Sequence, residues 1–447
     1  MRWVALALLV GVVGVVAGIP YVHNVDSGEG EVWAVLVAGS YSWMNYRHQA
    51  DVCHAYQILH QHGVADDHII VMMYDDIANS KENPHPGQII NRPGGPNVYP
   101  GVPKDYTGAN VNLDNFLKVL KGDSEGLKGV GSGKVLKSGP NDRVFINLVD
   151  HGAPGLFALI GDILTTTNLT DAILSMHHNK QYKELTLYVE SCESGSLFQK
   201  LPHDINVYAV SASNATESSY ACYFEAELKT FLGDVFSIKW MEDTDRENVA
   251  KETLKKQYHV VESETKTSHV LQWGQISIDT EKVGAFVGSY KTGGDGGDVY
   301  GPFPPIADPC LKSSITSPDV PLALIQTHIQ DSQGLIGSTF WHQEMDELKK
   351  NRTFVRDTMQ KIIQQVTRDT EVTTRLMTDH HNVIFNHECY ESSVMTFHNL
   401  CFNLGHNPYA LRVVYALVNL CEHGYTAQEF TCSARAVCDF EPVIGIN

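Results

Sequence analysis

A run of apolar and β-branched residues that ends abruptly in polar ones is the feature that most constrains this chain. Residues 185–189 read Leu-Thr-Leu-Tyr-Val, and Glu190, Ser191 and Cys192 follow directly. A short continuous apolar run of this kind is typical of a strand buried on both faces of a parallel sheet. Sites in open α/β sheets form at the carboxyl ends of strands, so Cys192 lies where such a site would be built. Taken alone, a single cysteine in this position is more often a buried structural residue.

Similar apolar runs alternate with helical patterns over the first 290 residues. Strands are predicted over residues 31–38, 68–74, 143–149, 185–190 and 205–212, and helices over 47–62, 112–121, 169–177 and 253–261. This alternation predicts right-handed βαβ units and an α/β fold with a mostly parallel sheet sandwiched by helices. Long surface loops rich in Gly and Pro are expected between these elements, over residues 79–108 and 126–140.

Composition divides the chain into four regions. Residues 1–18 combine Arg2, an apolar stretch and small residues at its end, which together predict a secretory signal peptide. Residues 19–289 carry the α/β pattern. Residues 290–331 form a linker, and the Gly- and Pro-rich residues 284–321 are expected to have little regular structure. Residues 332–447 have helical periodicity, so a second, all-α domain is predicted.

The charge balance narrows the choice of partners and compartment. The chain has 52 acidic against 33 basic residues and a net charge of −19, which argues against nucleic acid and anionic membranes as partners. The acidic balance and the 21 histidines fit an acidic compartment. No segment reaches the roughly 20 apolar residues that span a bilayer. A soluble protein of the secretory route is expected, with glycosylation sequons at Asn168, Asn214 and Asn351.

The nine cysteines are unevenly distributed. In an oxidising route the crowded C-terminal group predicts disulfides. That group consists of Cys389, Cys401, Cys421, Cys432 and Cys438. Cys53, Cys192 and Cys222 are scattered over the first 290 residues and are expected to be mostly free thiols, which leaves Cys192 available for chemistry.

Two reactive groups follow the third and fourth predicted strands. His151 comes just after residues 143–149, and Cys192 just after residues 185–190. If these strands are neighbours, both side chains rise at one edge of the sheet, and the imidazole can accept the thiol proton. The N–H groups of Gly152 and Cys192 can then bind a developing oxyanion. The alternative for His151 is a strand-end histidine held by a backbone partner.

The residues around this pair resemble a known family. Asp150-His151-Gly152 together with Glu190-Ser191-Cys192-Glu193-Ser194-Gly195 resembles the legumains, the asparaginyl endopeptidases of the caspase-like cysteine peptidases. The similarity continues in the segments Asn45-Tyr-Arg-His-Gln-Ala-Asp51, Val102-Pro-Lys-Asp-Tyr-Thr-Gly108, Glu217-Ser-Ser-Tyr-Ala-Cys222 and Trp240-Met-Glu-Asp243. It covers nearly the whole chain after the signal. The resemblance implies a caspase-like catalytic domain followed by a helical, death-domain-like inhibitory prodomain.

The resemblance assigns roles residue by residue. Cys192 would be the nucleophile, His151 the general base and acid, and Asn45 the residue that orients His151. Gly152 and Cys192 would supply the oxyanion N–H groups, and Asp150 matches the residue reported in the family to cyclise to a succinimide during peptide ligation. The implied specificity pocket consists of Arg47, His48, Glu190, Ser218, Ser219 and Asp234.

The chemistry of this pocket suits an asparagine side chain. An amide offers an acceptor oxygen and a donor NH2 group on one short stem. Arg47 can donate to the oxygen, while Glu190 and Asp234 can accept from the nitrogen. A charged aspartate would place an oxygen against these acids, whereas a protonated one would fit, so aspartate should be tolerated as the pH falls. Without the resemblance, Arg47 and His48 would be interpreted as a solvated first helical turn.

Processing and cross-linking are further implications. The resemblance pairs Cys389 with Cys421 and Cys401 with Cys438. It leaves the state of Cys310 and Cys432 open, and a disulfide between these two is one of the possibilities. No asparagine lies between Glu281 and Lys350. Cleavage that releases the prodomain is therefore expected after an aspartate at acid pH, with Asp331 as the candidate, or by another protease.

The function expected from the whole chain is a cysteine endopeptidase that cleaves after asparagine, made as an acid-activated zymogen with peptide ligase side activity. Its expected partners are protein and peptide substrates and cystatin-type inhibitors. We expect a monomer without cofactor or metal, in lysosomes or endosomes or secreted into an acidic gut-type lumen. A dedicated transpeptidase is an alternative that the sequence does not separate, because ligation depends on how water reaches the acyl-enzyme. A non-catalytic binding protein of the same fold is a second alternative, which the intact Asn45, His151 and Cys192 disfavour.

Overall fold

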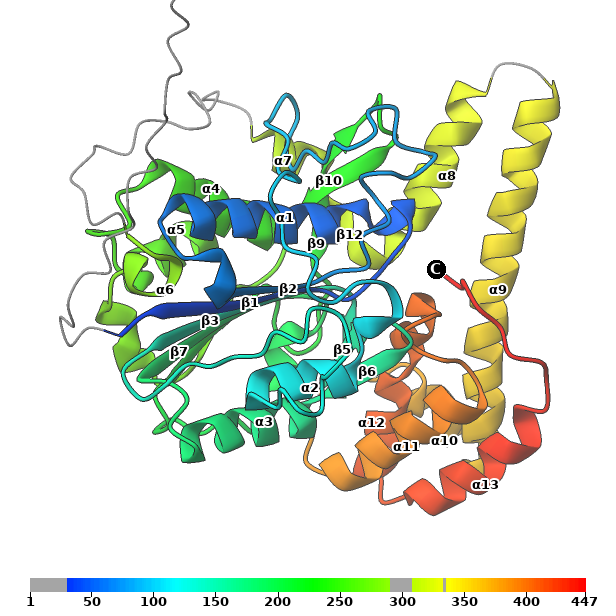
Figure 1. Ribbon diagram of the computed structural model, residues 1–447. Coiled ribbons are helices and arrows are strands. Elements are labelled where there is room, and N and C mark those ends of the chain that lie inside the picture. The colour runs from blue at the N-terminus through cyan, green and yellow to red at the C-terminus, as the bar shows by residue number, and fades with distance from the viewer. Residues whose placement is uncertain (1–29, 290–307, 333–334) are drawn as a thin grey trace, which may run out of the picture.

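The structure is a computed structural model of the 447-residue chain and describes residues 30–289, 308–332 and 335–447. The predicted signal peptide, residues 1–18, lies outside the described residues. Figure 1 shows an α/β domain (residues 30–289), a helical domain (residues 335–447) and a connecting segment (residues 308–332) that runs between them. No helix among the described residues is both long and apolar enough to cross a bilayer.

A six-stranded sheet forms the centre of the α/β domain, in the order β11-β8-β7-β3-β1-β2. Its parallel strands are β1 (Val32–Ala38), β2 (Ile69–Met72), β3 (Arg143–Val149), β7 (Glu184–Glu190) and β8 (Val207–Ser211), and β11 (Leu271–Gly274) is antiparallel at one edge. The parallel strands are buried almost throughout because helices cover both faces of the sheet. The predicted mostly parallel sheet is confirmed.

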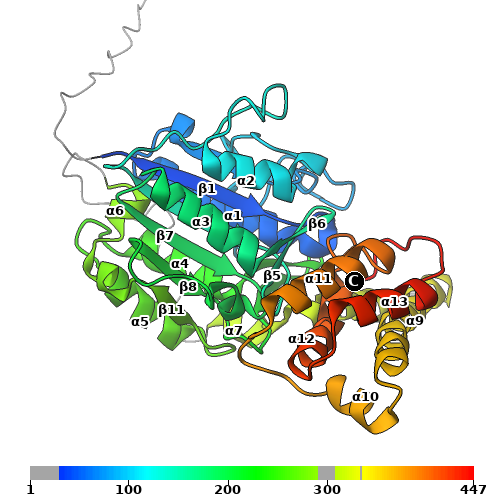
Figure 2. The same cartoon turned by 90° about the horizontal axis from the view of Figure 1, so that it is seen from below.

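The two faces of the sheet have separate cores. In β1, Leu36 packs into one core and Val35 into the other, as expected for side chains that alternate across a strand. The first core is covered by α1 (Tyr46–Gln61), α4 (Val235–Arg246), α5 (Leu254–Glu264) and α6 (Gly284–Val287), and the second by α2 (Leu113–Lys121) and α3 (Thr166–His178). Figures 1 and 2 show this three-layer arrangement from two sides.

Two small antiparallel sheets lie beyond the carboxyl ends of the central strands. One consists of β4 (Gly152–Ala153), β5 (Leu156–Leu159) and β6 (Asp162–Thr165). The other has the order β10-β9-β12, with β9 (Tyr220–Glu225), β10 (Thr230–Asp234) and β12 (Ile315–Thr316). These strands have two to six residues. Runs so short carry little periodicity, and the sequence patterns did not predict them.

The connecting segment is more structured than predicted. It contains α7 (Pro309–Ser313), β12 and α8 (Val320–Asp331), so the expectation of little regular structure is wrong for its described residues. The Asp308 carboxylate accepts hydrogen bonds from two backbone N–H groups at the start of α7. A disulfide joins Cys310 of α7 to Cys222 of β9. The predictions that Cys222 is a free thiol and that Cys310 could pair with Cys432 are therefore wrong.

The helical domain consists of α9 (Leu335–Thr367), α10 (Thr370–Leu376), α11 (His387–Leu400), α12 (Tyr415–Glu422) and α13 (Ala427–Val437). Disulfides join Cys389 to Cys421 and Cys401 to Cys438, the pairing that the resemblance implied. The core of this domain is continuous with Leu156 and Ile163 of the β5–β6 hairpin. The helical domain is thus packed onto the α/β domain at the end where the central strands terminate (Figure 2).

Candidate active site

Strands β3 and β7 are neighbours along their whole length, as the sequence analysis required. Their last residues, Val149 and Glu190, are paired, and the Asp150 N–H donates to the Glu190 carbonyl at 3.0 Å. His151 and Cys192 each follow that last pair by two residues. Both line one pocket at the carboxyl edge of the sheet.

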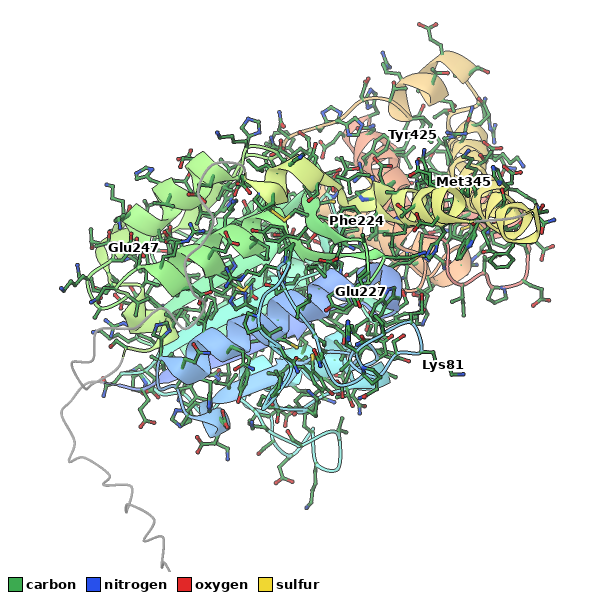
Figure 3. The ribbon with its side chains drawn as sticks, turned by 90° about the horizontal axis from the view of Figure 1, so that it is seen from above. Lys81, Phe224, Glu227, Glu247, Met345 and Tyr425 are labelled. Carbon is green, nitrogen blue, oxygen red and sulfur yellow. A yellow bond between two sulfur atoms is a disulfide. The ribbon has the colours of Figure 1, made fainter. Side chains whose placement is uncertain are left out.

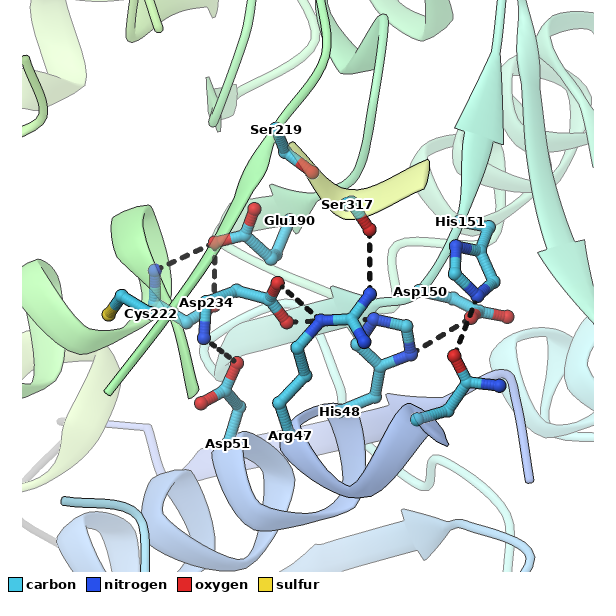
Figure 4. A network of polar contacts seen from close by, with 12 residues as sticks. Arg47, His48, Asp51, Asp150, His151, Glu190, Ser219, Cys222, Asp234 and Ser317 are labelled. Atoms are coloured by element: carbon cyan, nitrogen blue, oxygen red, sulfur yellow. Dashed lines mark hydrogen bonds and ion pairs between the residues drawn. The ribbon is translucent and has the colours of Figure 1, made fainter. Parts of the chain in front are cut away.

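Asn45 fixes the orientation of the His151 ring. His151 Nε2 lies 2.8 Å from Asn45 Oδ1, a contact drawn as the dashed line at His151 in Figure 4. Asn45 Nδ2 donates to the Tyr41 carbonyl at 2.9 Å. The second bond sets the amide so that its oxygen faces the ring. An amide oxygen only accepts, so the hydrogen lies on Nε2, and Nδ1 is the ring nitrogen left for proton exchange.

Cys192 is held as a neutral thiol in the structure. Its side chain is buried, with Sγ 3.7 Å from Ser219 Oγ. Burial, with the nearby Glu193 carboxylate, raises the pKa of Cys192 to about 11. Burial, with the Arg47 guanidinium, lowers the pKa of His151 to about 3. A neutral thiol is a weak nucleophile, because the thiolate is the reactive form, and a neutral imidazole can still accept a proton.

The backbone around Cys192 is constrained from two directions. A Cβ atom on Gly152 would lie 2.3 Å from the Cys192 carbonyl oxygen and 2.7 Å from Ser191 Oγ, so only glycine allows this close approach. Glu193 has φ of 51°, in the left-handed region, which turns the chain sharply after Cys192. The turn is held by the Glu193 N–H, which donates to the Glu217 carbonyl at 2.8 Å.

Arg47 is the centre of a second buried network beside this pair. Its Nε donates to Asp234 Oδ1 at 2.8 Å and its Nη2 to Ser317 Oγ at 2.6 Å (Figure 4). Its Nη1 donates to the Met44 carbonyl at 3.1 Å. Arg47 and His48 have 0% and 1% of their surface exposed. A solvated first helical turn, the alternative that composition alone favoured, is therefore wrong.

The carboxylates around Arg47 retain unused acceptors. Glu190 Oε2 accepts from the Ser237 N–H at 2.8 Å and from its hydroxyl at 3.1 Å. Glu190 Oε1 and Asp234 Oδ2 are buried and have no hydrogen-bond partner among the described residues. Burial raises the pKa of both carboxyls. The pocket thus contains one cation and two carboxyl oxygens that accept no hydrogen bond, with His48 Nε2 3.6 Å from Asp234 Oδ2.

His48 and Asp150 form a polar layer behind His151. His48 Nδ1 lies 2.6 Å from Ser40 Oγ and 3.1 Å from Asp150 Oδ1, and the His48 ring meets the His151 ring edge-on at 5.0 Å. Burial raises the pKa of Asp150 well above its usual range and lowers that of His48 well below its own. Burial thus favours the neutral form of each group.

Two groups of side chains have potential metal-ligating atoms close together among the described residues. The first is His48, Asp150 and His151, and the second is Asp243, Glu247 and Glu252. In the first group, His151 Nε2 already faces Asn45 and His48 Nδ1 faces Ser40. In the second, the Lys256 ammonium lies 2.8 Å from Glu247 and 3.1 Å from Glu252 and supplies the positive charge.

The structure brings most of the predicted pocket residues together and adds others. Ser218 is half-buried beside Ser219, on the segment that precedes β9. Asp51, which accepts from the Asp234 N–H at 3.2 Å, was missed although it lies one helical turn after Arg47. Ser237 was also missed, and no sequence signal marked it. Arg412 and Ser317 lie outside the α/β domain and carried no signal for this site either.

The connecting segment occupies the pocket. Strand β12 pairs with β9 in antiparallel register, Ile315 with Ala221 and Thr316 with Tyr220. The Ser317 N–H donates to the Ser219 carbonyl at 2.9 Å, and the Ser317 hydroxyl accepts the Arg47 bond. Extended chain of this kind binds a sheet edge as an added strand. Ser317 therefore fills the space beside Arg47.

The helical domain closes the pocket from the other side. Arg412 Nη1 donates to Glu193 Oε1 at 2.8 Å, one residue from Cys192. Arg352 of α9 donates to the Pro318 carbonyl at 2.7 Å and to the Asn447 carbonyl at 2.8 Å. Further lining comes from Pro321, Pro408, Tyr409 and Leu411. Cys192 is thus inaccessible in the intact chain.

Comparison with known proteins identifies both domains. The profile of the peptidase C13 family matches residues 32–289, and that of the legumain prodomain matches residues 343–438. Legumain from Bos taurus is 45% identical over 443 residues, covering 98% of this chain and 99% of that protein. Legumain from Homo sapiens is 45% identical over 412 residues, covering 92% and 93%. The vacuolar-processing enzyme delta-isozyme of Arabidopsis thaliana is 40% identical over 431 residues, covering 92% and 91%.

Among solved structures, caspase-1 from Spodoptera frugiperda aligns with a TM-score of 0.34 and 9% identity, covering 58% of this chain and 94% of that chain. The family assignment rests on the profiles and on the full-length relatives. The α/β domain matches the peptidase profile and the helical domain matches the prodomain profile. The chain belongs to the peptidase C13 family and is a cysteine endopeptidase that carries the legumain prodomain.

Proposed function

We propose that this chain is the latent form of an endopeptidase that cleaves after asparagine, and after aspartate at acid pH. The observation that carries this proposal is the pair of buried oxygens that accept no hydrogen bond, Glu190 Oε1 and Asp234 Oδ2, beside the Arg47 guanidinium. An asparagine amide can accept from Arg47 and donate its two N–H bonds to these oxygens. Burial favours protonation of both carboxyls, so in acid they can also donate to a substrate carboxylate.

In the proposed mechanism, Cys192 is the nucleophile and His151 the general base and acid. The thiol proton passes to His151 Nδ1 while Sγ attacks the substrate carbonyl carbon, and the N–H groups of Gly152 and Cys192 bind the oxyanion. The imidazolium then protonates the leaving amine, and an acyl-enzyme forms. Water hydrolyses this thioester, or a peptide amine attacks it and forms a new peptide bond, which is the proposed ligase side activity. Asp150, buried beside His48, is the proposed succinimide residue.

Latency and acid activation follow from groups at the domain interface. Burial alone would raise the pKa of Glu391, but the His387 ring, 3.6 Å away, and hydrogen bonds from Thr167 lower it below its ordinary value. Thr167 belongs to the α/β domain, and its hydroxyl donates to Glu391 at 2.8 Å. A carboxyl with a depressed pKa stabilises docking above its ordinary pKa, and this stabilisation is lost as the pH falls through the lowered value. Acid therefore loosens the helical domain, and cleavage after Asp331 frees it.

The proposed setting is the secretory route, ending in lysosomes, endosomes or an acidic gut-type lumen, where three disulfides persist. The sequon residues Asn168, Asn214 and Asn351 are partly exposed and are the proposed glycosylation sites. They lie in the first turn of α3, in the loop after β8 and in α9. We propose a monomer whose released active site is open to protein substrates and to cystatin-type inhibitors.

The direct test is acid activation followed by an assay on fluorogenic peptides that differ only in Asn, Asp or Gln before the scissile bond. We expect the Asn peptide to be cleaved at every pH tested and the Asp peptide only at acid pH. The Gln peptide should not be cleaved at any pH. The matched control is Cys192→Ala, which should not cleave. Equal cleavage after Asn and Gln would contradict the proposed specificity. Mass spectrometry of the products formed from an Asn peptide and an added peptide amine measures the fraction of product that is ligated and not hydrolysed.

A further inference from the structure

The side chains beside β12 indicate which residues would contact a substrate side chain two positions before the cleaved residue. Ile315 belongs to β12, and Ser317 directly follows this strand, where its N–H still donates to the Ser219 carbonyl at 2.9 Å. Ser317 points to Arg47, in the position proposed for the substrate asparagine. Ile315 packs against an apolar cluster that contains Ala221 and Phe231. A substrate strand in the same register would place its own side chain on this cluster.

We propose that Met44, Ala221, Phe224 and Phe231 form a subsite for an apolar substrate side chain two positions before the cleaved asparagine. We name these four residues the apolar subsite. Phe224 and Phe231 face each other across the β9–β10 pair with ring centroids 5.4 Å apart. Val320 and Leu324 of α8 complete the same cluster in the intact chain. Phe224 lies close to this helix in the view of Figure 3.

The apolar subsite becomes available only when the connecting segment leaves. Met44 and Phe224 are already half-buried, and removal of Ile315, Val320 and Leu324 would expose apolar surface beside the Arg47 pocket. A leucine or isoleucine of the substrate would cover that surface again, whereas an aspartate would lose its hydration there. This inference rests on the proposed cleavage after asparagine.

The test compares three reporter peptides of sequence X-Ala-Asn with X as Leu, Ala or Asp, on the acid-activated and reduced enzyme. We expect kcat/KM to be about tenfold higher for Leu than for Asp. Phe224→Lys should reverse the order and favour Asp, and the milder Phe224→Ser should flatten it. Glu227→Lys is the matched control, because it adds a lysine at an exposed position of the same β9–β10 hairpin (Figure 3). Equal rates for all three peptides would overturn the subsite alone, whereas no cleavage after asparagine in any of them would overturn the proposed function.

A separate observation concerns how the connecting segment is anchored. The Cys222–Cys310 disulfide attaches α7 to β9, and both cysteines are fully buried. Cys222 is the residue after Ala221, which pairs with Ile315. Only four residues separate Cys310 from Ile315. The strand that fills the pocket is therefore tied covalently to the sheet edge that it occupies.

We further propose that this disulfide keeps β12 in the substrate groove after the backbone is cut, so that full activity requires its reduction. Cleavage after Asp331 removes the helical domain but leaves Ser317 bonded to Arg47. A cut before Asp308 would sever the other backbone connection, yet the disulfide would still hold the segment at a high effective concentration. Removal of the helical domain and removal of the pocket strand are thus two separate steps.

The second step is a thiol–disulfide exchange with a small thiol reductant of the glutathione or cysteine class. One thiolate attacks a sulfur of the bridge, forms a mixed disulfide and releases the other cysteine as a thiolate that takes up a proton. A second reductant thiol resolves the mixed disulfide, so both protein thiols are restored and one reductant disulfide is formed. Because both sulfurs are buried, α7 must open before the attack can occur.

The test compares the wild-type chain with the double variant Cys222→Ser, Cys310→Ser after acid activation without reductant under argon. In both, titration of Cys192 after unfolding verifies that its thiol is reduced. We expect low wild-type activity that rises at least tenfold on addition of dithiothreitol, and full activity of the double variant from the start. Intact mass without reductant should show the segment retained on a chain cut on both sides. Wild-type activity equal to that of the double variant before reduction, with the segment still attached, would overturn the proposal.

Discussion

His151 Nε2 lies 2.8 Å from Asn45 Oδ1, and this contact joins the loop after β3 to the residue before α1. The Asn45 amide is itself held by the Tyr41 carbonyl. Together the two bonds select one tautomer of the imidazole and one ring orientation. Catalysis by a thiol–imidazole pair depends on both, because the proton must arrive at the nitrogen that faces the sulfur.

Asn45→Ala should lower kcat by about 100-fold while KM changes by less than about threefold, because the ring loses its tautomer and orientation but the Arg47 pocket stays intact. The measurement is steady-state kinetics of the activated enzyme on an Asn reporter peptide. Asn248→Ala, at an exposed position after α4, is the matched control and should leave both constants unchanged. A kcat for Asn45→Ala close to that of the wild type would show that the bond does not orient the catalytic ring.

The reactivity of Cys192 should change on release of the helical domain. In the intact chain, burial and Glu193 raise the pKa of Cys192 to about 11, so its alkylation by iodoacetamide should be slow at neutral pH. Release restores water to the thiol, so its pKa should fall and alkylation should accelerate by at least about tenfold. Mass spectrometry of alkylated peptides measures both states.

Two other cysteines serve as internal controls for this experiment. Cys432 is exposed and should react in both forms, whereas Cys53 is buried, with its pKa raised to about 12 by burial, and should react in neither. Rapid alkylation of Cys192 in the intact chain would contradict the covered site.

The sequence predicted the central sheet because buried parallel strands leave continuous apolar runs, and residues 143–149 and 185–190 are such runs. It predicted the pair of His151 and Cys192 for the same reason, since each follows one of these strands. It did not predict β12 or α8. Their order comes from the pairing of Ile315 with Ala221 and from the Cys222–Cys310 bond, which are contacts between residues about 90 positions apart.

The pocket was predicted through resemblance and not through pattern. Arg47 lies in the first turn of a helix, where local sequence favours exposure, and only tertiary packing buries it against Asp234. Neither the resemblance nor the sequence pattern predicted which residue fills the pocket. Ser317 is an ordinary residue in a Pro-rich segment, and its role appears only when the chain is folded back along β9.

Glu190→Gln should extend aspartate cleavage toward neutral pH. Burial raises the pKa of Glu190, so in the wild type its carboxyl is protonated in acid and repels a substrate carboxylate as the pH rises through the raised value. Glutamine keeps the shape and removes this charge. We expect the ratio of Asp to Asn cleavage at neutral pH to rise about tenfold, as measured by kcat/KM on matched peptides.

Glu225→Gln, at a partly exposed position at the end of β9, is the control for Glu190→Gln and should leave that ratio unchanged. If Glu190→Gln lost cleavage of both peptides in the same proportion, Glu190 would contribute to substrate binding in general and not to the choice between the two side chains.

His398 should make undocking of the helical domain sensitive to pH. Burial, with the nearby His406, lowers the pKa of His398 below its ordinary value of 6.5, although Asp162 of the α/β domain opposes the shift. Its Nδ1 accepts from the Leu404 N–H at 3.2 Å, in the loop where Asn403 Nδ2 donates to the Gly161 carbonyl at 2.9 Å. A histidine with a depressed pKa binds fewer protons when docked than when released, so docking is stable at neutral pH and weakens as the pH falls below the ordinary value.

His398→Gln should therefore keep the domain docked to a pH about half a unit lower than the wild type. The measurement uses a Cys192→Ala chain cut once between α8 and α9 by an added protease, with co-elution of the two parts followed by size exclusion across a pH series. His381→Gln, at an exposed position, is the control. If the two parts of the His398→Gln chain co-eluted over the same pH range as those of the wild type, His398 would not contribute to the acid response.

Asp331→Ala should block the cut that releases the helical domain. Asp331 is the last residue of α8, half-exposed, and its carboxylate lies 3.1 Å from Lys229 Nζ. Such a surface pair contributes only about 0–1 kcal/mol, so it does not hold Asp331 back from the proposed pocket. Because Ser317 fills the pocket of every chain with an intact Cys222–Cys310 disulfide, the cut should be made by chains in which this disulfide has been reduced, and its rate should rise with the concentration of such chains. N-terminal sequencing after acid treatment should find Ser332 as the new N-terminus in the wild type and in the Asp346→Ala control. Release of the helical domain should be at least about tenfold slower in Asp331→Ala and absent in Cys192→Ser. A Cys192→Ser chain that matures alone would show that the peptidase site does not make this cut.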